Sequence, residues 1–196
     1  QLPPLEVRAI RASERAPFAK QNLSKADIQK NNLGPDLPFL LNQTPSVVVQ
    51  SDAGNGIGYT GIRIRGTDAT RINVTINGIA YNDAESMGTF LVNLPDFASS
   101  VSSIQIQRGV GSSSNGPSAF GASINLSTHE LNEKAYFNTS NSAGSFGTLK
   151  NTIQFGSGLI NKYFTVDARL GSIKSDGYID RASSDLRSYY VSGAYI

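Results

Sequence analysis

The chain has 196 residues, of which 39% are hydrophobic and 16% are charged, and its formal net charge is +2. The charged share lies below the usual value of about 25%, and no basic stripe with interleaved aromatic residues is present, so a nucleic-acid-binding protein is not expected. There is no cysteine and one histidine, His129. This excludes disulfide frameworks and thiolate chemistry and leaves little material for zinc sites or catalytic triads. We therefore expect no enzyme, no metal site and no cofactor.

The first elements are short. Residues 2–10 are predicted to be extended, because proline favours extended backbone in itself and in its neighbours. Ser24 and Asp27 form a capping-box pattern, which predicts that a short helix follows Ser24. A second short helix is predicted over residues 36–42, before a strand that starts at Val47.

The next stretch alternates between strands and polar loops. Apolar residues at every second position predict strands at 62–65, 72–76, 104–108 and 123–126. Asn77-Gly78 is a strong hairpin signal. Glycine-rich or polar loops are predicted over 51–61 and 81–95. The pattern indicates a domain of short helices, strands and structured loops.

Beyond residue 134 the sequence becomes a regular succession of strand patterns. Four segments of suitable length are predicted as strands, at 135–143, 149–158, 163–174 and 186–196. Apolar and polar residues alternate in the third segment, so one face is apolar and the other polar. This pattern fits tilted transmembrane strands and equally fits a soluble antiparallel sheet with one wet face. If the strands lie in lipid, four cannot close a barrel, and the natural protein is expected to continue.

Two further sequence patterns resemble functional motifs, but neither is interpreted as a functional site. Residues 111–116 match the first half of a phosphate-binding loop, but Pro117 stands where the loop needs its lysine. Asp83 and Glu85 are interpreted as solvated loop acids, because no neighbouring group is expected to tune their pKa values for acid–base catalysis.

Four motifs occur in a fixed order: Ile62-Arg63-Ile64-Arg65-Gly66-Thr67, Ile76-Asn77-Gly78, Ile104-Gln105-Ile106-Gln107-Arg108-Gly109 and Gly121-Ala122-Ser123-Ile124-Asn125-Leu126-Ser127-Thr128. In this order and at these distances they resemble the signature of the TonB-dependent receptor plug, over about residues 5–128. Asn77, Gln105 and Ala122-Ser123 depart from the family's usual Asp, Glu and Gly-Val. The stretch 89–126 most resembles receptors of Bacteroidetes-type bacteria.

The resemblance implies an α+β plug domain, with short helices and a four-stranded mixed sheet, followed by the first antiparallel strands of a transmembrane β-barrel. Residues 1–12 would be an extended N-terminal segment, 13–130 the plug, and 131–196 about four barrel strands. The family's barrels have roughly 22 strands around a plugged lumen. The implied location is the cell outer membrane, with the plug inside the lumen and the N-terminus in the periplasm.

The resemblance also implies a function. A receptor of this class imports a bulky, scarce nutrient, here a ferric siderophore or haem, with energy transmitted by TonB. Its expected partners are the C-terminal domain of TonB, the rest of its own barrel, outer-membrane lipid and a metal-chelate ligand. A cobalamin receptor is the alternative within the class. A passive adhesin or surface-binding β protein is the alternative outside it.

One set of candidate residues lies at the N-terminus. Leu5, Glu6, Val7, Arg8 and Ala9 stand where such receptors carry the TonB box. An extended segment of this kind can add as a strand to the sheet of a partner. The alternative interpretation is an ordinary frayed terminus.

The other candidates lie in the plug. The loops 52–60 and 81–93 correspond to plug loops that face the external substrate chamber, and the residues expected to contact ligand there are Asn55, Tyr59, Asn82, Asp83, Met87 and Phe90. Arg65 and Arg108 resemble plug arginines that pair with barrel glutamates. No glutamate follows Glu133, so their partners would lie in the rest of the barrel.

Overall fold

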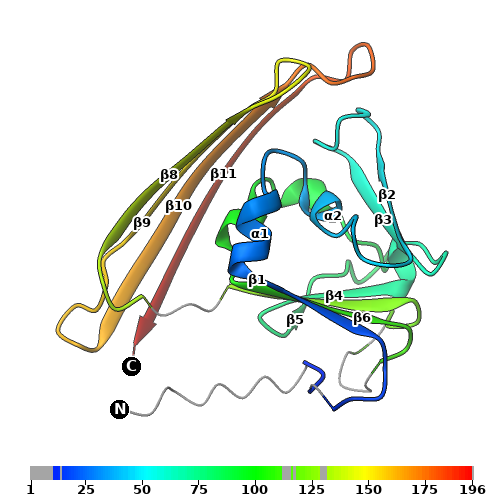
Figure 1. The fold of residues 1–196 in the computed structure, drawn as a ribbon, viewed down its shortest axis with the longest axis horizontal. Coiled ribbons are helices and arrows are strands. Elements are labelled where there is room, and N and C mark those ends of the chain that lie inside the picture. Colours follow the sequence, from blue (N-terminus) through cyan, green and yellow to red (C-terminus); the bar gives the residue numbers. More distant parts are fainter. Residues whose placement is uncertain (1–10, 14, 112–115, 117, 129–131, 196) are drawn as a thin grey trace.

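The computed structural model describes residues 11–13, 15–111, 116, 118–128 and 132–195. They form an N-terminal unit, residues 11–128, and a C-terminal sheet of long strands that curves along one side of it (Figure 1). No helix in the described part of the chain is long and apolar enough to cross a membrane.

The N-terminal unit contains most of the short elements. In chain order they are β1 (Lys20–Ser24), α1 (Lys25–Asn31), α2 (Leu37–Leu40), β2 (Val47–Ser51), β3 (Thr60–Ile64), η1 (Ala69–Arg71), β4 (Ile72–Ile76), β5 (Ile79–Ala80), η2 (Leu91–Asn93), η3 (Phe97–Ser100), β6 (Ser103–Arg108) and β7 (Ala122–Ser127). The predicted capping box is confirmed, since the Ser24 hydroxyl accepts from the Asp27 amide and the Asp27 carboxylate accepts from the Ser24 amide. The predicted helices and strands are found within a few residues.

The main sheet has five strands in the order β1-β6-β7-β4-β5, one more than the four that the resemblance implied. β4 and β7 run parallel and the other neighbours antiparallel, so the sheet is mixed as expected. One edge strand that the sequence pattern did not predict, β1, pairs with β6 in the register Lys20↔Gln107. Its sequence, KQNLS, has a single apolar residue and therefore gave no strand signal.

The core lies on one face of this sheet. Ile72, Val74, Ile104, Ile106 and other apolar residues of β4, β6 and β7 are buried against side chains such as Ile28 of α1 and Leu41 after α2. Each fully buried side chain of this size contributes roughly 1.5–3 kcal/mol. Burial of this face therefore fixes the position of both helices.

The opposite face of the sheet is polar and also buried. The N-terminal strap, residues 11–13 and 15–19, lies against this face. The Gln105 side chain accepts from the Ala12 amide at 2.7 Å and donates to the Ala12 carbonyl at 3.1 Å. Arg11 donates to the Ser103 carbonyl at 3.0 Å. Polar bonds, and not an apolar core, therefore attach the strap to the sheet.

The C-terminal sheet consists of β8 (Tyr136–Ala143), β9 (Leu149–Gly156), β10 (Phe164–Ser175) and β11 (Ser184–Tyr195), all antiparallel. The four predicted strands are thus confirmed. Its polar face is buried toward the N-terminal unit, with Lys150, Thr152 and Arg169 inward. Its apolar face is exposed, as Leu170 and Tyr189 show. A soluble sheet packs the other way round, with its apolar face toward the core.

Candidate functional site at the interface of the two units

A buried carboxylate joins the N-terminal unit to two strands of the C-terminal sheet. Asp96, immediately before η3, forms ion pairs with Lys150 of β9 at 2.9 Å and with Arg169 of β10 at 3.0 Å. The three side chains are at most 4% exposed. Thr152 donates to the same carboxylate at 2.7 Å, and Ser99 also donates to it. Both oxygens of Asp96 are therefore fully used.

Local backbone geometry places this carboxylate. Asp96 has a left-handed conformation with φ of 54°, which aspartate tolerates better than most residues. On the facing strand, a Cβ at Gly171 would lie 2.6 Å from Oδ2 of Asp96. Glycine at position 171 therefore leaves the room in which the carboxylate meets β10.

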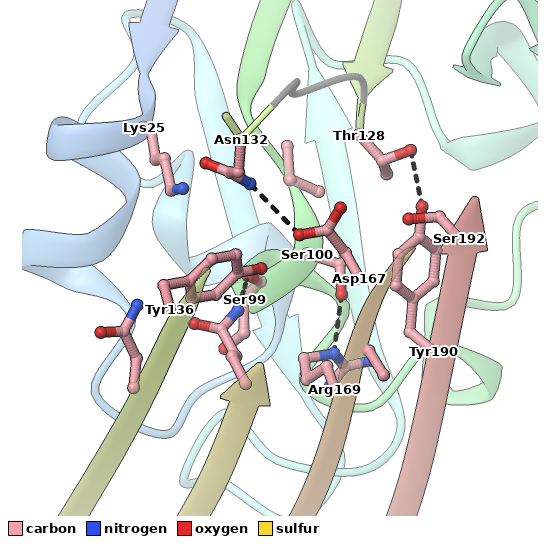
Figure 2. A pocket seen from close by; sticks show the side chains of 14 residues that line it. Lys25, Ser99, Ser100, Thr128, Asn132, Tyr136, Asp167, Arg169, Tyr190 and Ser192 are labelled. Atoms are coloured by element: carbon pink, nitrogen blue, oxygen red, sulfur yellow. Dashed lines mark hydrogen bonds between the residues drawn. The ribbon is translucent and has the colours of Figure 1, made fainter. Parts of the chain in front are cut away.

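A small polar cavity of about 50 Å³ lies beside this cluster, between η3 and the inner face of the strands (Figure 2). Arg169 donates to the Ser100 hydroxyl at 2.7 Å. Asn132 donates to Asp167 at 3.2 Å. Tyr190 of β11 donates to Thr128 at 3.0 Å. The cavity walls thus come from both units, and hydrogen bonds between side chains connect them.

The hairpin of β2 and β3 is attached to the loop between β10 and β11, residues 176–183. The Tyr178 amide donates to the Ala53 carbonyl at 2.9 Å, and the Asn55 side chain donates to Ser175 at 2.6 Å. Figure 1 shows the hairpin tip reaching the same end of the molecule as this loop. Asn55 is therefore engaged in holding the hairpin, whereas the Tyr59 side chain is 66% exposed.

Asp36 holds the tip loop of this hairpin. Its amide donates to the Gly56 carbonyl at 2.8 Å, and its carboxylate accepts from the Thr60 hydroxyl at 3.1 Å and from the Gly58 amide. Burial raises the pKa of Asp36 to about 7, although both hydrogen bonds act in the opposite direction. The charge on this carboxyl group therefore changes near neutral pH.

The second candidate loop, 81–93, is organised by its own polar residues. The Asn82 side chain accepts from the Val74 amide at 2.8 Å and donates to the carbonyls of Ile72 and Met87, both at 2.9 Å. Asp83 accepts from the Ser86 amide and hydroxyl, which hold the pKa of Asp83 below its usual value. Asn82 and Asp83 thus shape the loop.

Two of the six residues expected to contact ligand present apolar surface from this loop. Met87 is 42% and Phe90 is 50% exposed. Among the described residues, no hydrogen bond joins loop 81–93 to the hairpin of β2 and β3. Contact of all six residues with a ligand remains a prediction.

The two candidate arginines lie next to each other at the end of β6. Arg65 is exposed, and a Cβ at Gly109 would lie 2.6 Å from its guanidinium. Arg108 donates to the Pro45 carbonyl at 3.3 Å, while its Nε is buried without a hydrogen-bond partner among the described residues. A carboxylate would satisfy that donor. Pairing of Arg65 and Arg108 with glutamates elsewhere in the barrel remains a prediction. The candidate TonB box, Leu5 to Ala9, lies outside the described residues.

Sequence reasoning missed Asp96, Lys150 and Arg169. A signal was present, because Lys150 and Arg169 are the basic residues on the polar faces of the segments predicted as strands, and a charge on an inward face needs a partner. The described residues contain no group of three or more acidic, histidine or cysteine side chains that could hold a metal ion.

The comparison with protein families is decisive for the N-terminal unit. The family described as TonB-dependent Receptor Plug Domain matches residues 12–123, more than half of the chain. The chain belongs to this family. The N-terminal unit is accordingly called the plug from here on. No curated protein sequence matches the chain.

Solved structures match both units of the fold. FpvA of P. aeruginosa, in complex with an iron-loaded heterologous pyoverdine, has a TM-score of 0.70 and 14% identity over 90% of this chain and 23% of its own. The ferric-catecholate import receptor Fiu of E. coli K12 has a TM-score of 0.70 and 20% identity over 91% and 24%. The copper transporter OprC has a TM-score of 0.68 and 17% identity over 93% and 28%.

These matches confirm the expected fold class, a plug followed by antiparallel strands. The chain spans about a quarter of the length of the solved structures. The activity, substrate and partners of the whole protein are therefore addressed below as proposals.

Proposed function

We propose that the chain is the plug and the first wall strands of an energy-coupled receptor in the cell outer membrane. Residues 1–12 would be the TonB-accessible segment, 13–130 the plug and 131–196 the first barrel strands. The orientation of the C-terminal sheet supports this most directly. Its polar face packs on the plug, and its exposed face carries Phe164, Leu170, Tyr189 and Val191. An apolar face of this kind is favourable in lipid and unfavourable in water.

The side chains at the two ends of the exposed face are those expected where a barrel wall leaves the hydrocarbon layer of a bilayer. At one end Tyr163 and Tyr195 stack with ring centroids 6.3 Å apart. Toward the other end Lys174 and Asp185 form an exposed ion pair at 3.2 Å. Aromatic girdles mark the interfaces of outer-membrane barrels, and charged residues belong outside the hydrocarbon. The apolar band between them is what membrane insertion requires.

The proposed ligand is a metal chelate, a ferric siderophore or haem. The support is indirect: among the matched structures, FpvA is bound to an iron-loaded pyoverdine, Fiu is a ferric-catecholate import receptor and OprC is a copper transporter. Tyr59, Met87 and Phe90 expose aromatic and thioether surface that suits a bulky, partly apolar ligand. In our proposal these three residues contact the ligand, and Asn55, Asn82 and Asp83 hold the loops that present them.

The proposed mechanism is mechanical, without covalent chemistry. Ligand binds at the external end, the N-terminal segment becomes available to TonB in the periplasm, and the inner-membrane proton gradient supplies the energy. Tension would first reach the N-terminal strap, in which the Ala12 amide donates to Gln105 and Arg11 donates to the Ser103 carbonyl. Polar bonds of this kind can exchange for water when the strap moves. The plug then shifts enough for the ligand to pass.

Growth and uptake measurements test this function. A receptor-deletion strain that carries the full-length receptor is supplied with ferric siderophores, haem, copper or cobalamin as sole sources. We expect uptake of a ferric siderophore or haem that stops when a proton uncoupler is added. Deletion of residues 5–9 should abolish uptake and leave ligand binding intact. Uptake that persists without a proton gradient, or ligand binding without any uptake, would indicate a passive surface protein instead.

A further inference from the structure

The plug contacts the C-terminal sheet through neutral hydrogen bonds and through a charged cluster at Asp96. Ser142 donates to the Leu33 carbonyl at 2.6 Å, and Gln154 donates to the carbonyl of Ser99. Among the described residues, the ion pairs that Lys150 and Arg169 form with the plug both end on Asp96. The Asp96 cluster is therefore the electrostatic centre of this interface.

Removal of the carboxylate would leave a charge imbalance inside the interface. Lys150 also donates to the Asn32 side chain at 2.7 Å, and Arg169 also donates to Ser188 at 3.0 Å, but these partners are neutral. Without Asp96, two cations would lie buried with no opposite charge in contact. Breaking a buried pair in this way is far more costly than losing an exposed one.

The shape of the contact is as specific as its charge. Gly171 lets the carboxylate reach β10, because a Cβ there would also lie 2.8 Å from the Ser188 hydroxyl and 3.0 Å from Arg169. The left-handed backbone of Asp96 directs the side chain into this space. Backbone conformations of this kind persist where the surroundings hold them in place.

We propose that Asp96 is a charge latch, whose ion pairs with Lys150 and Arg169 hold the plug closed against the first wall strands and separate when the plug moves. The latch rests on the proposed function, because it assigns a closed state to a plug that opens. It predicts that the cost of opening depends on one carboxylate, and that exposed ion pairs on the same strands have no effect.

Solute leakage tests the latch without TonB or ligand. The purified full-length receptor is placed in liposomes, and swelling in a small sugar reports an open lumen. We expect Asp96→Asn to raise the swelling rate at least about tenfold, because it leaves two buried cations unpaired. Gly171→Ala should act in the same direction, since it pushes the carboxylate away while every charge is kept. Heat-modifiable migration on gels verifies that each barrel is assembled.

Two matched controls and one rescue separate the latch from general damage. Asp185→Asn removes an exposed ion pair within β10 and β11, and Gly193→Ala adds a methyl group whose nearest neighbour lies 3.6 Å away. Both should swell like the wild type. Adding Lys150→Met and Arg169→Met to Asp96→Asn should bring swelling back toward the wild type, because no unpaired charge remains.

Several results would overturn the latch. They are wild-type swelling of Asp96→Asn and Gly171→Ala, swelling of the two controls as fast as that of Asp96→Asn, and no rescue in the neutral triple variant. The proposed function fails separately, if the wild-type receptor takes up no ligand when the proton gradient is present. A leaky Asp96→Asn receptor in that case would still establish the latch.

Discussion

In the main sheet of the plug, apolar side chains of β4, β6 and β7 face α1 and α2, whereas in the C-terminal sheet they face away from the protein. The polar faces differ as well. In the plug that face is covered by the strap from residue 11, and in the C-terminal sheet it meets the plug through Asp96. The same alternation of side chains thus serves two environments, water around a small core and lipid around a polar interior.

Truncation of a side chain in the plug core should have the largest effect on stability. Ile106 is fully buried in β6. Ile106→Ala should reduce the free energy of unfolding of the plug by about 4 kcal/mol, since it removes buried methyl groups and leaves a cavity. The same change at Ile153, 40% exposed on the outer face of β9, should cost less than about 1 kcal/mol, because lipid tails can fill the space. Urea titration with proteolysis of the plug measures the first effect. Equal losses at both positions would contradict the proposed difference in surroundings.

A charge placed on the outer face of the C-terminal sheet should have the next largest effect, on membrane insertion. Leu170 is 53% exposed in the middle of the apolar band. In a bilayer, Leu170→Arg should make insertion less favourable by about 3 kcal/mol. On a soluble sheet the same change would be nearly neutral. The measurement is the urea dependence of folding into vesicles, with Ser145→Arg, at an exposed position of the loop between β8 and β9, as the control. Insertion unaffected by Leu170→Arg would refute lipid contact.

The smallest effect concerns Asp36, which holds the tip loop of the β2–β3 hairpin. Its pKa is raised to about 7 in the folded plug, against an ordinary value of 3.8. The folded state therefore keeps a proton that the unfolded chain has lost, so this contribution to stability is complete below about pH 4 and is lost as pH rises through about 7. Above pH 7, Asp36→Asn should stabilise the hairpin by on the order of 2 kcal/mol.

Proteolysis of the hairpin at pH 6 and pH 8 measures this effect. Cleavage of the wild type should increase with pH, after correction for protease activity, and cleavage of Asp36→Asn should not. Asp52→Asn, in the turn of the same hairpin, is the control. A wild-type hairpin equally resistant at both pH values would show that Asp36 is not held protonated.

Much of the local structure was predictable because its causes are local. The capping box of Ser24 and Asp27, the Asn77-Gly78 turn and the alternation in β10 are encoded by neighbouring residues. The order of the plug motifs likewise indicated the family before the fold was known. β1 escaped prediction because its pairing with β6 depends on backbone hydrogen bonds and not on an apolar pattern.

Contact of the six candidate loop residues with a ligand stays a prediction, and the structure shows how each of them is placed. Tyr59, Met87 and Phe90 are exposed as ligand-contacting residues require, but Asn55, Asn82 and Asp83 are engaged in holding backbone and loops. The Asp96 cluster could not be derived in the same way. Asp96 lies more than fifty residues before both Lys150 and Arg169 in the sequence, so only long-range packing brings the carboxylate to the two cations.

The sequence by itself determined most of the strands, the capping box at Ser24 and the two-faced pattern of β10. It left open which face of β8 to β11 is covered, because alternation has the same period in a soluble sheet and in a barrel wall. The tertiary structure decided this by placing Lys150 and Arg169 against the carboxylate of Asp96. Buried charges need a partner, and the plug supplies one, so the polar face turns inward and the apolar face is left outside.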